Sequence, residues 1–263
     1  MPRMSDMKGT PRRALHVFYV LDTSRSMEGR RIAALNKAME ETTAILSQQA
    51  QRNADAQVKI AVLEFNSGCQ WLQPKGPENM EDFIWSSRTA GGLTDIGHAI
   101  EELNDKLSRK AFLSSDTGAY VPIIIFMTDG YATDNYKKAL EQIRRNKWFA
   151  YAIKIGFALG DAADTEMITE IVGHSEAVVK TQDLAVFTRL LRFVSLTSTL
   201  LGSQSRTETE ELSGRMIVKQ ALKDGMIQEE DVDWDKSGSK KSQDVETEYA
   251  VDIDDMEEWD WDD

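Results

Sequence analysis

The chain lacks the features of a disulfide-linked, zinc-binding or membrane-spanning protein. Its 263 residues include a single cysteine, Cys69, which excludes an internal disulfide and a cysteine-based zinc site. We expect this thiol to be buried as a small apolar side chain. No stretch reaches the roughly 18 to 20 apolar residues of a membrane span, and residues 1–15 lack the apolar middle of a secretory signal. These absences predict a cytoplasmic protein that does not associate with membranes.

Positive charge is scarce relative to negative charge, because the chain has 31 Lys and Arg residues against 44 Asp and Glu residues. From Thr207 onward the chain has 20 acidic and 6 basic residues, so the preceding 206 residues carry 24 acidic and 25 basic ones. Such an asymmetry indicates a neutral body followed by a separate acidic tail. Neither part has the basic stripe that phosphate neutralisation requires, so nucleic acid is not an expected partner.

Between Arg12 and Leu201, short apolar runs alternate with stretches of helical spacing. The run VPIIIFM is apolar on both sides of the pleat, as in central parallel strands, whereas CQWL follows its predecessor closely enough to pair antiparallel with it. The alternation predicts an α/β fold with a doubly wound, mostly parallel central sheet of about six strands and one antiparallel edge strand. The predicted strands are residues 16–21, 58–65, 69–72, 121–127, 149–157 and 177–179, and the predicted helices are residues 32–46, 96–107 and three that begin near residues 134, 163 and 183.

Three polar clusters lie at predicted strand ends, which is where open α/β sheets bind their ligands. The first, in the run DTSRS, holds Asp22, Ser24 and Ser26. The second holds Thr94 after two glycines, and the third holds Asp129 in FMTDG. All five side chains offer oxygen and none offers nitrogen or sulfur, which favours Mg²⁺ or Mn²⁺ as the bound metal, ahead of Ca²⁺. Only two of the five are ionised, so a cation held there would remain receptive to a carboxylate from outside.

Helix capping is the alternative interpretation of these clusters, because Ser, Thr and Asp are common N-caps and turn formers. Thr94 or Asp95 would then cap the helix that begins at Ile96, and Thr133 or Asp134 the next one. The occurrence of all three clusters in order favours the metal site. The three histidines show no ligand spacing and are expected to be structural, with satisfied ring nitrogens. Neither a three-glycine dinucleotide pattern nor a G-x-x-x-x-G-K-[ST] run occurs, so a nucleotide site has no support.

The pattern DTSRS, Thr94 and TDG resembles the metal-ion-dependent adhesion site of von Willebrand factor A (VWA) domains. The resemblance covers about Leu15 to Leu200 and implies a non-enzymatic, metal-dependent protein-interaction module, in which a partner supplies an Asp or Glu to the metal. Arg25 stands where many members have glycine, at a variable position of the motif. The residues that match the five metal-site positions of the family are Asp22, Ser24, Ser26, Thr94 and Asp129.

Two further stretches are similar to the bacterial tellurite-resistance TerY-like group of VWA domains. They are KIGFALGDAADTEMITEIVG and FTRLLRFVSLTSTL. Members of that group are cytoplasmic and in some gene neighbourhoods accompany a protein kinase and a protein phosphatase. The resemblance therefore implies an adaptor in a phospho-signalling, stress or tellurite-resistance system.

Two alternative functions use the same residues. A magnesium-dependent phosphatase of the haloacid dehalogenase type would need a second aspartate two residues after Asp22, where this chain has Ser24, and a serine of ordinary pKa does not protonate a leaving group effectively. An adaptor for an AAA+ ATPase, as in metal chelatases or MoxR-like systems, keeps the fold and changes the partner. A kinase and phosphatase pair in the gene neighbourhood would favour the TerY-like role, and a chelatase-like or MoxR-like ATPase the alternative.

The resemblance and the change of composition after Gly202 together predict an N-terminal arm (1–14), a VWA domain (15–201), a linker with a short helix (202–225) and an acidic tail (226–263). Thr207 and Glu210 form a candidate capping box for the short helix. The tail is too charged to fold alone and has the composition of a disordered segment. Its tryptophans favour a partner-binding role, because interleaved acids and aromatics suit a basic, apolar groove. The candidate binding residues of the tail are Trp234, Trp259 and Trp261.

Overall fold

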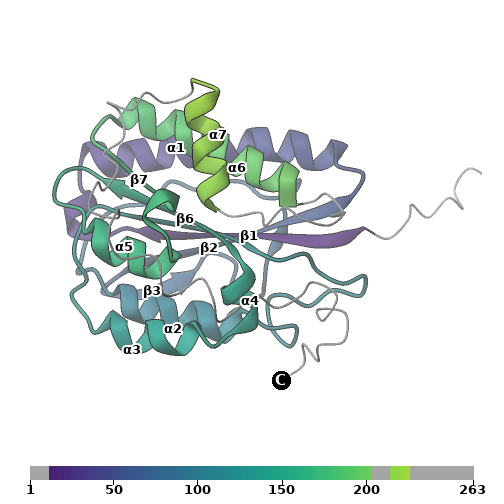
Figure 1. Cartoon of the computed structure of the whole chain (residues 1–263), viewed down its shortest axis with the longest axis horizontal. Helices are drawn as coiled ribbons and strands as arrows, with labels where there is room; N and C mark the ends of the chain where they lie inside the picture. Colours follow the sequence, from purple (N-terminus) through teal and green to yellow (C-terminus); the bar gives the residue numbers. More distant parts are fainter. Residues whose placement is uncertain (1–11, 203–213, 226–263) are drawn as a thin grey trace, which may run out of the picture.

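The structure is a computed structural model that describes residues 12–202 and 214–225. A central sheet lies between two layers of helices (Figure 1). Its strand order is β3-β2-β1-β5-β6-β7, with β4 pairing to β2. The parallel strands are β1 (Arg13–Asp22), β2 (Ala56–Asn66), β5 (Ile123–Thr128), β6 (Ile153–Leu159) and β7 (Val178–Thr181), and the antiparallel strands are β3 (Gly68–Trp71) and β4 (Glu78–Asn79). The predicted fold class is confirmed.

The central strands are apolar on both faces because helices cover both sides of the sheet. All six residues of β5 are buried. Along β1, Val17, Tyr19 and Leu21 belong to one core, and Phe18 and Val20 belong to the other. This alternation of side chains divides the apolar interior into two layers, one on each face of the sheet.

Helices from the two ends of the chain cover one face and helices from its middle cover the other (Figure 1). On α1, Leu35, Met39 and Leu46 recur at helical spacing and are buried. The helices of the first face are α1 (Arg30–Arg52), α6 (Leu184–Gly202) and α7 (Gly214–Lys223), and those of the second are α2 (Ile96–Lys106), α3 (Tyr136–Ile143), α4 (Lys147–Tyr151) and α5 (Thr165–Val172).

The predicted strand over residues 149–157 begins too early, because Phe149–Tyr151 lies in α4. The side chain of Asn146 accepts a hydrogen bond from the Trp148 N–H and so caps the first turn of α4. At the other end, the Lys154 amine donates to the carbonyl oxygens of Phe149, Ala150 and Ala152. Both ends of this short helix are therefore satisfied by side chains, and the apolar run alone does not reveal that. The two-residue strand β4 was not predicted.

Helix α7 packs against the main body. Ile217, Val218 and Ala221 are fully buried in the α1–α6 core layer. At the start of α7, a Cβ on Gly214 would collide with the carbonyl oxygen of Lys154, so the glycine permits this close approach. Arg215 and Lys219 both pair with Glu176 on the body. The predicted domain boundaries stay a prediction, and residues 1–11, 203–213 and 226–263, including the candidate cap formed by Thr207 and Glu210, lie outside the described residues.

Two expectations about single residues are corrected. Cys69, on the edge strand β3, is only partly buried, and burial together with nearby acids raises the pKa of its thiol to about 12. His16 is fully buried in β1, yet neither ring nitrogen has a hydrogen-bond partner. None of the helices in residues 12–202 and 214–225 combines the length and the apolar character needed to cross a membrane.

Candidate metal centre

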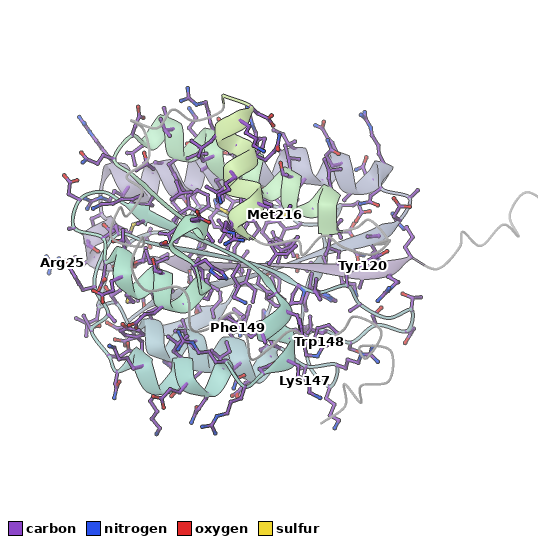
Figure 2. The ribbon with its side chains drawn as sticks, in the orientation of Figure 1. Arg25, Tyr120, Lys147, Trp148, Phe149 and Met216 are labelled. Atoms are coloured by element: carbon purple, nitrogen blue, oxygen red, sulfur yellow. The ribbon has the colours of Figure 1, made fainter. Side chains whose placement is uncertain are left out.

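The predicted site residues lie at one edge of the sheet, where β1 and β5 end side by side. Asp22 is the last residue of β1, and Asp129 follows the last residue of β5. These strands are parallel neighbours, with Leu21 opposite Met127, so their carboxyl ends present both aspartates at the same edge. Ser24 and Ser26 follow in the loop and 3-10 turn after β1. Figure 2 shows Arg25 of this turn at the left end of the molecule, directed away from the body.

Hydrogen bonds join the first and third clusters, and the second lies beside them. The hydroxyls of Ser24 and Ser26 are 2.9 Å apart, and the Ser26 hydroxyl donates to Asp129 Oδ1 at 2.6 Å. A Cβ added at Gly130 would lie 3.5 Å from Ser26 Oγ and 3.9 Å from Thr94 Oγ1, so Thr94 approaches the same point from a third loop. The fold thus brings the five predicted residues together, although their sequence positions span more than 100 residues.

The carboxylate of Asp22 is completely buried, and both of its oxygens accept hydrogen bonds. Oδ1 accepts from the Ser24 N–H at 2.7 Å and Oδ2 accepts from the Thr128 hydroxyl at 2.5 Å. Burial raises the pKa of Asp22, the charge of Asp129 adds to the rise, and the hydrogen bonds from Ser24 and Thr128 oppose it. Asp22 and Asp129 are both buried, and carboxylates in such surroundings favour a cation that shares their negative charge.

Arg31 supplies positive charge to one of these carboxylates. Its guanidinium donates to Asp129 Oδ2 at 2.8 Å and to the backbone oxygen of Ser26 at 3.1 Å. The Arg31 side chain is 36% exposed, whereas that of Asp129 is 0% exposed. Arg31 therefore lies between the site and solvent and neutralises Asp129 from the outer side. No motif in the sequence marks Arg31 as part of the site, because it lies in the first turn of α1, beyond the DTSRS run.

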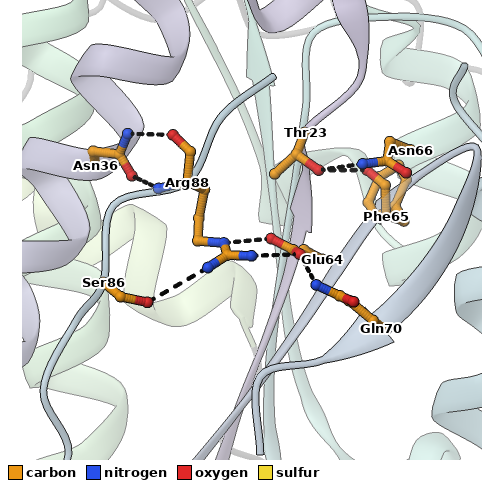
Figure 3. Close-up of polar contacts among 8 residues, drawn as sticks. All are labelled: Thr23, Asn36, Glu64, Phe65, Asn66, Gln70, Ser86 and Arg88. Carbon is orange, nitrogen blue, oxygen red and sulfur yellow. Dashed lines mark hydrogen bonds and ion pairs between the residues drawn. The ribbon is translucent and has the colours of Figure 1, made fainter. Parts of the chain in front are cut away.

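A partly buried ion pair holds the loop that leads to Thr94 (Figure 3). Glu64 on β2 accepts hydrogen bonds from Arg88 Nε at 2.5 Å and Nη2 at 2.6 Å. The backbone of Arg88 also exchanges two hydrogen bonds with the Asn36 side chain on α1. Farther along the loop, the Arg25 N–H donates to the Gly92 oxygen at 3.1 Å. The loop is thereby fixed to the sheet, to α1 and to the first cluster.

The capping alternative fails for the second and third clusters. Neither Thr94 nor Asp95 caps α2 with its side chain. Instead, the two carboxylate oxygens of Asp134 accept hydrogen bonds from the N–H groups of Gly97 and His98, each at 2.9 Å. Helix α3 begins after Asn135 without a side-chain cap. Asp134 therefore caps the preceding helix from across the loop. This leaves the Thr94 hydroxyl available to a ligand.

The donor set fits a hard divalent cation. It comprises two carboxylates and three hydroxyls, and oxygen donors of this kind suit Mg²⁺, Mn²⁺ or Ca²⁺. Among the described residues, no group of three or more His, Cys, Asp and Glu side chains gathers into a metal-binding cluster, and the candidate site itself has two carboxylates. Thr128 belongs to the site as the hydrogen-bond partner of Asp22, and its place before Asp129 in the TDG run was the signal available in the sequence. The candidate tail residues Trp234, Trp259 and Trp261 lie outside the described residues.

Comparison with known proteins gives one matching family model and several solved structures of similar fold. The model of the von Willebrand factor type A domain matches residues 16–192. A search of curated proteins found no match. Solved structures of similar fold include the VWA2 paralogue of ArnB from Sulfolobus acidocaldarius (18% identity, TM-score 0.50, covering 70% of this chain and 45% of that one). A von Willebrand factor type A protein from Catenulispora acidiphila has 16% identity and a TM-score of 0.50, covering 71% of this chain and 43% of that one.

A third similar structure is proximal thread matrix protein 1 from the mussel byssus with a zinc-occupied MIDAS motif. It has 16% identity and a TM-score of 0.51, covering 69% of this chain and 47% of that one. This chain spans less than half the length of each of the three structures. At these identities the comparison establishes the fold alone.

Proposed function

Since the chain belongs to the von Willebrand factor type A domain family, we propose that it is a non-enzymatic module that binds a protein partner through a divalent cation. The observation that carries the proposal is the convergence of Ser24, Ser26 and Asp129 in one hydrogen-bonded chain beside the buried Asp22. A bound cation would account for three hydroxyls and two carboxylates gathered where two parallel strands end, and helix capping does not account for the second and third clusters.

The residues that would hold the cation are Asp22, Ser24, Ser26, Thr94 and Asp129. We propose Mg²⁺ or Mn²⁺, with Ca²⁺ less suited, because these are hard ions that accept carboxylate and hydroxyl oxygens. When bound, such an ion supplies a positive centre that attracts an Asp or Glu of the partner. With only two anionic ligands from this chain, the affinity for the metal is expected to be weak and the attraction for an external carboxylate strong.

The environment of Asp22 supports binding over catalysis. A phosphatase of the haloacid dehalogenase type needs an aspartate two residues after its nucleophile to protonate the leaving group. The position two residues later is Ser24, whose hydroxyl contacts that of Ser26 and has no acidic proton to offer. We therefore propose no phosphatase activity for this site.

The proposal also names the class of protein partner. The stretches from Lys154 to Gly173 and from Phe187 to Leu200 support a TerY-like adaptor that acts with a protein kinase and a protein phosphatase in a stress or tellurite-resistance system. An adaptor of an AAA+ ATPase is the alternative, since the same site and fold would serve it. The identity of the captured partner distinguishes the two.

The test is an affinity capture from native lysate with the full chain as bait, in Mg²⁺ and again with a chelator. Asp22→Asn should abolish the Mg²⁺-dependent capture because it removes one charge with little change of shape. Asp116→Asn is the matched control, since Asp116 is an exposed acid in the loop before β5, at the opposite edge of the sheet. Capture that is insensitive to both the chelator and Asp22→Asn would refute the proposed function.

A further inference from the structure

The metal site is bordered by exposed apolar side chains. Leu93 is 56% exposed and adjoins Thr94, and Tyr131 is 63% exposed and follows Asp129 by two residues. Large apolar groups exposed beside a polar site mark an interaction surface. The large apolar side chains exposed by the described residues are Ile84, Leu93, Tyr131, Leu200 and Met216. Two of these five, Leu93 and Tyr131, border the metal site.

The loops that carry Leu93 and Tyr131 are fixed to each other. The Thr133 N–H donates to the Thr94 oxygen at 2.9 Å, and the Thr94 N–H donates to the Thr133 hydroxyl at 3.0 Å. Leu93 N–H donates to the Ser67 hydroxyl at 2.9 Å. Such a rigid border offers apolar area to a ligand without the entropy cost of ordering the loops on binding.

Arginines complete this surface. Arg25 is exposed between the two serines of the site, and Arg30 and Arg31 line an adjoining hollow of about 600 Å³. Glu28 and Asp161 line the same hollow, so its charge is mixed. Because the charge is mixed, acidity alone does not make a ligand suit this region. A suitable ligand combines a carboxylate for the metal with aromatic groups that contact Leu93 and Tyr131. We call Arg25, Leu93 and Tyr131, together with the metal site, the rim surface.

We propose that the rim surface binds residues 256–263 of this same chain, with an acidic side chain of the tail in the position of the partner's carboxylate. This segment, MEEWDWDD, combines five acids with Trp259 and Trp261. It provides both the chemistry that the metal requires and the aromatic area that Leu93 and Tyr131 match. The inference rests on the proposed function, because the carboxylate has no anchor without the cation. A partner then gains the site only by displacing the tail.

The tail is long enough to reach the site. Gly225 ends the described part of the chain, and Trp259 lies 34 residues later. A random coil of that length would have an end-to-end distance of about 30 Å, and its fully extended limit is about 110 Å. Helix α1 (Arg30–Arg52) runs from the hollow to the opposite edge of the sheet and is about 33 Å long. Tethering also gives an effective concentration of about millimolar, so weak contacts suffice to keep the tail bound.

The test uses the full chain with ¹⁵N-labelled tryptophan side chains and Mn²⁺ as the probe, because Mn²⁺ broadens NMR signals of nearby nuclei. We expect Mn²⁺ to abolish the indole signals of Trp259 and Trp261 in the native chain and to leave them intact in Asp22→Asn. Tyr131→Ser should restore both signals. Met216→Ser should not, because Met216 is an exposed apolar side chain on α7, away from the site (Figure 2).

Each outcome separates the tail contact from the proposed function. If calorimetry detects Mn²⁺ binding while the signals of Trp259 and Trp261 stay sharp, the tail contact is refuted and the proposed function stands. If Mn²⁺ does not bind to the chain, the proposed function itself fails. Broadening that disappears on dilution would identify a second copy as the occupant and refute the intramolecular contact. Equal broadening in the native chain and Tyr131→Ser would refute the rim surface.

Discussion

Replacing Arg31 with glutamine is expected to strengthen the binding of a divalent cation at the predicted metal site. The Arg31 guanidinium is 2.8 Å from Asp129 Oδ2, so it neutralises a carboxylate that the cation would otherwise share. At a separation of about 6 Å, a single and a double positive charge repel by about 1.4 kcal/mol at the dielectric constant of water. The water value applies because the Arg31 side chain is 36% exposed and its charge is screened. Removing that repulsion corresponds to about tenfold tighter binding.

Calorimetric titration of the full chain with Mn²⁺ measures this effect. The matched control is Arg52→Gln, which makes the same change at the other end of α1, about 32 Å along the helix axis. We expect Arg52→Gln to bind Mn²⁺ like the native chain. Unchanged or weaker binding by Arg31→Gln would show that Arg31 assists the site by orienting Asp129, and that its charge does not compete with the metal.

Three further variants are expected to change stability. Burial, and then the charge of Lys59, lower the pKa of His16 from 6.5 to about 3, so the contribution of the neutral ring is complete above pH 6.5 and is lost as the pH falls toward 3. Urea unfolding should therefore show about 2 kcal/mol more loss between pH 7 and pH 5 in the native chain than in His16→Phe, and equal losses would contradict this. Glu64→Gln removes the carboxylate that pairs with Arg88 and should lower the free energy of unfolding by about 2 kcal/mol, which is less than for a fully buried pair because Arg88 is 24% exposed. An unchanged melting temperature would refute the role of the pair in anchoring the loop. Gly156→Ala should cost about 1–3 kcal/mol, because a Cβ there would collide with α5, and a stability equal to that of the native chain would show that α5 can shift.

The sheet and the convergence of the candidate site residues were predictable from the sequence because both depend on local patterns at strand ends. The apolar runs of β1 and β5 mark strands, and each run ends in an aspartate that the parallel pairing brings to the same edge. The predicted start of β6 was several residues too early, because Asn146 and Lys154 satisfy the backbone groups at the ends of α4 through contacts that no periodicity reveals.

The residues that support the site were harder to predict. Arg31, Glu64 and Arg88 act through pairs that are 24 to 98 residues apart in the sequence, and no motif marks such pairs. His16 was also only partly predictable. Its position in a strand indicates burial, but only the surrounding apolar side chains determine that both ring nitrogens lack hydrogen-bond partners. Local spacing indicates the candidate site residues, and tertiary packing determines which side chains hold them in place.

Titration of the full chain with Mn²⁺ and Mg²⁺, followed by the heat of binding, tests most directly whether Asp22, Thr94 and Asp129 form part of a metal centre. The structure predicts one saturable site that Asp22→Asn weakens by more than about tenfold, since even residues that only contact metal ligands change affinity about 10–100-fold. Asp116→Asn should bind like the native chain. Absence of binding by both ions, or equal binding by Asp22→Asn and the native chain, would contradict the metal centre.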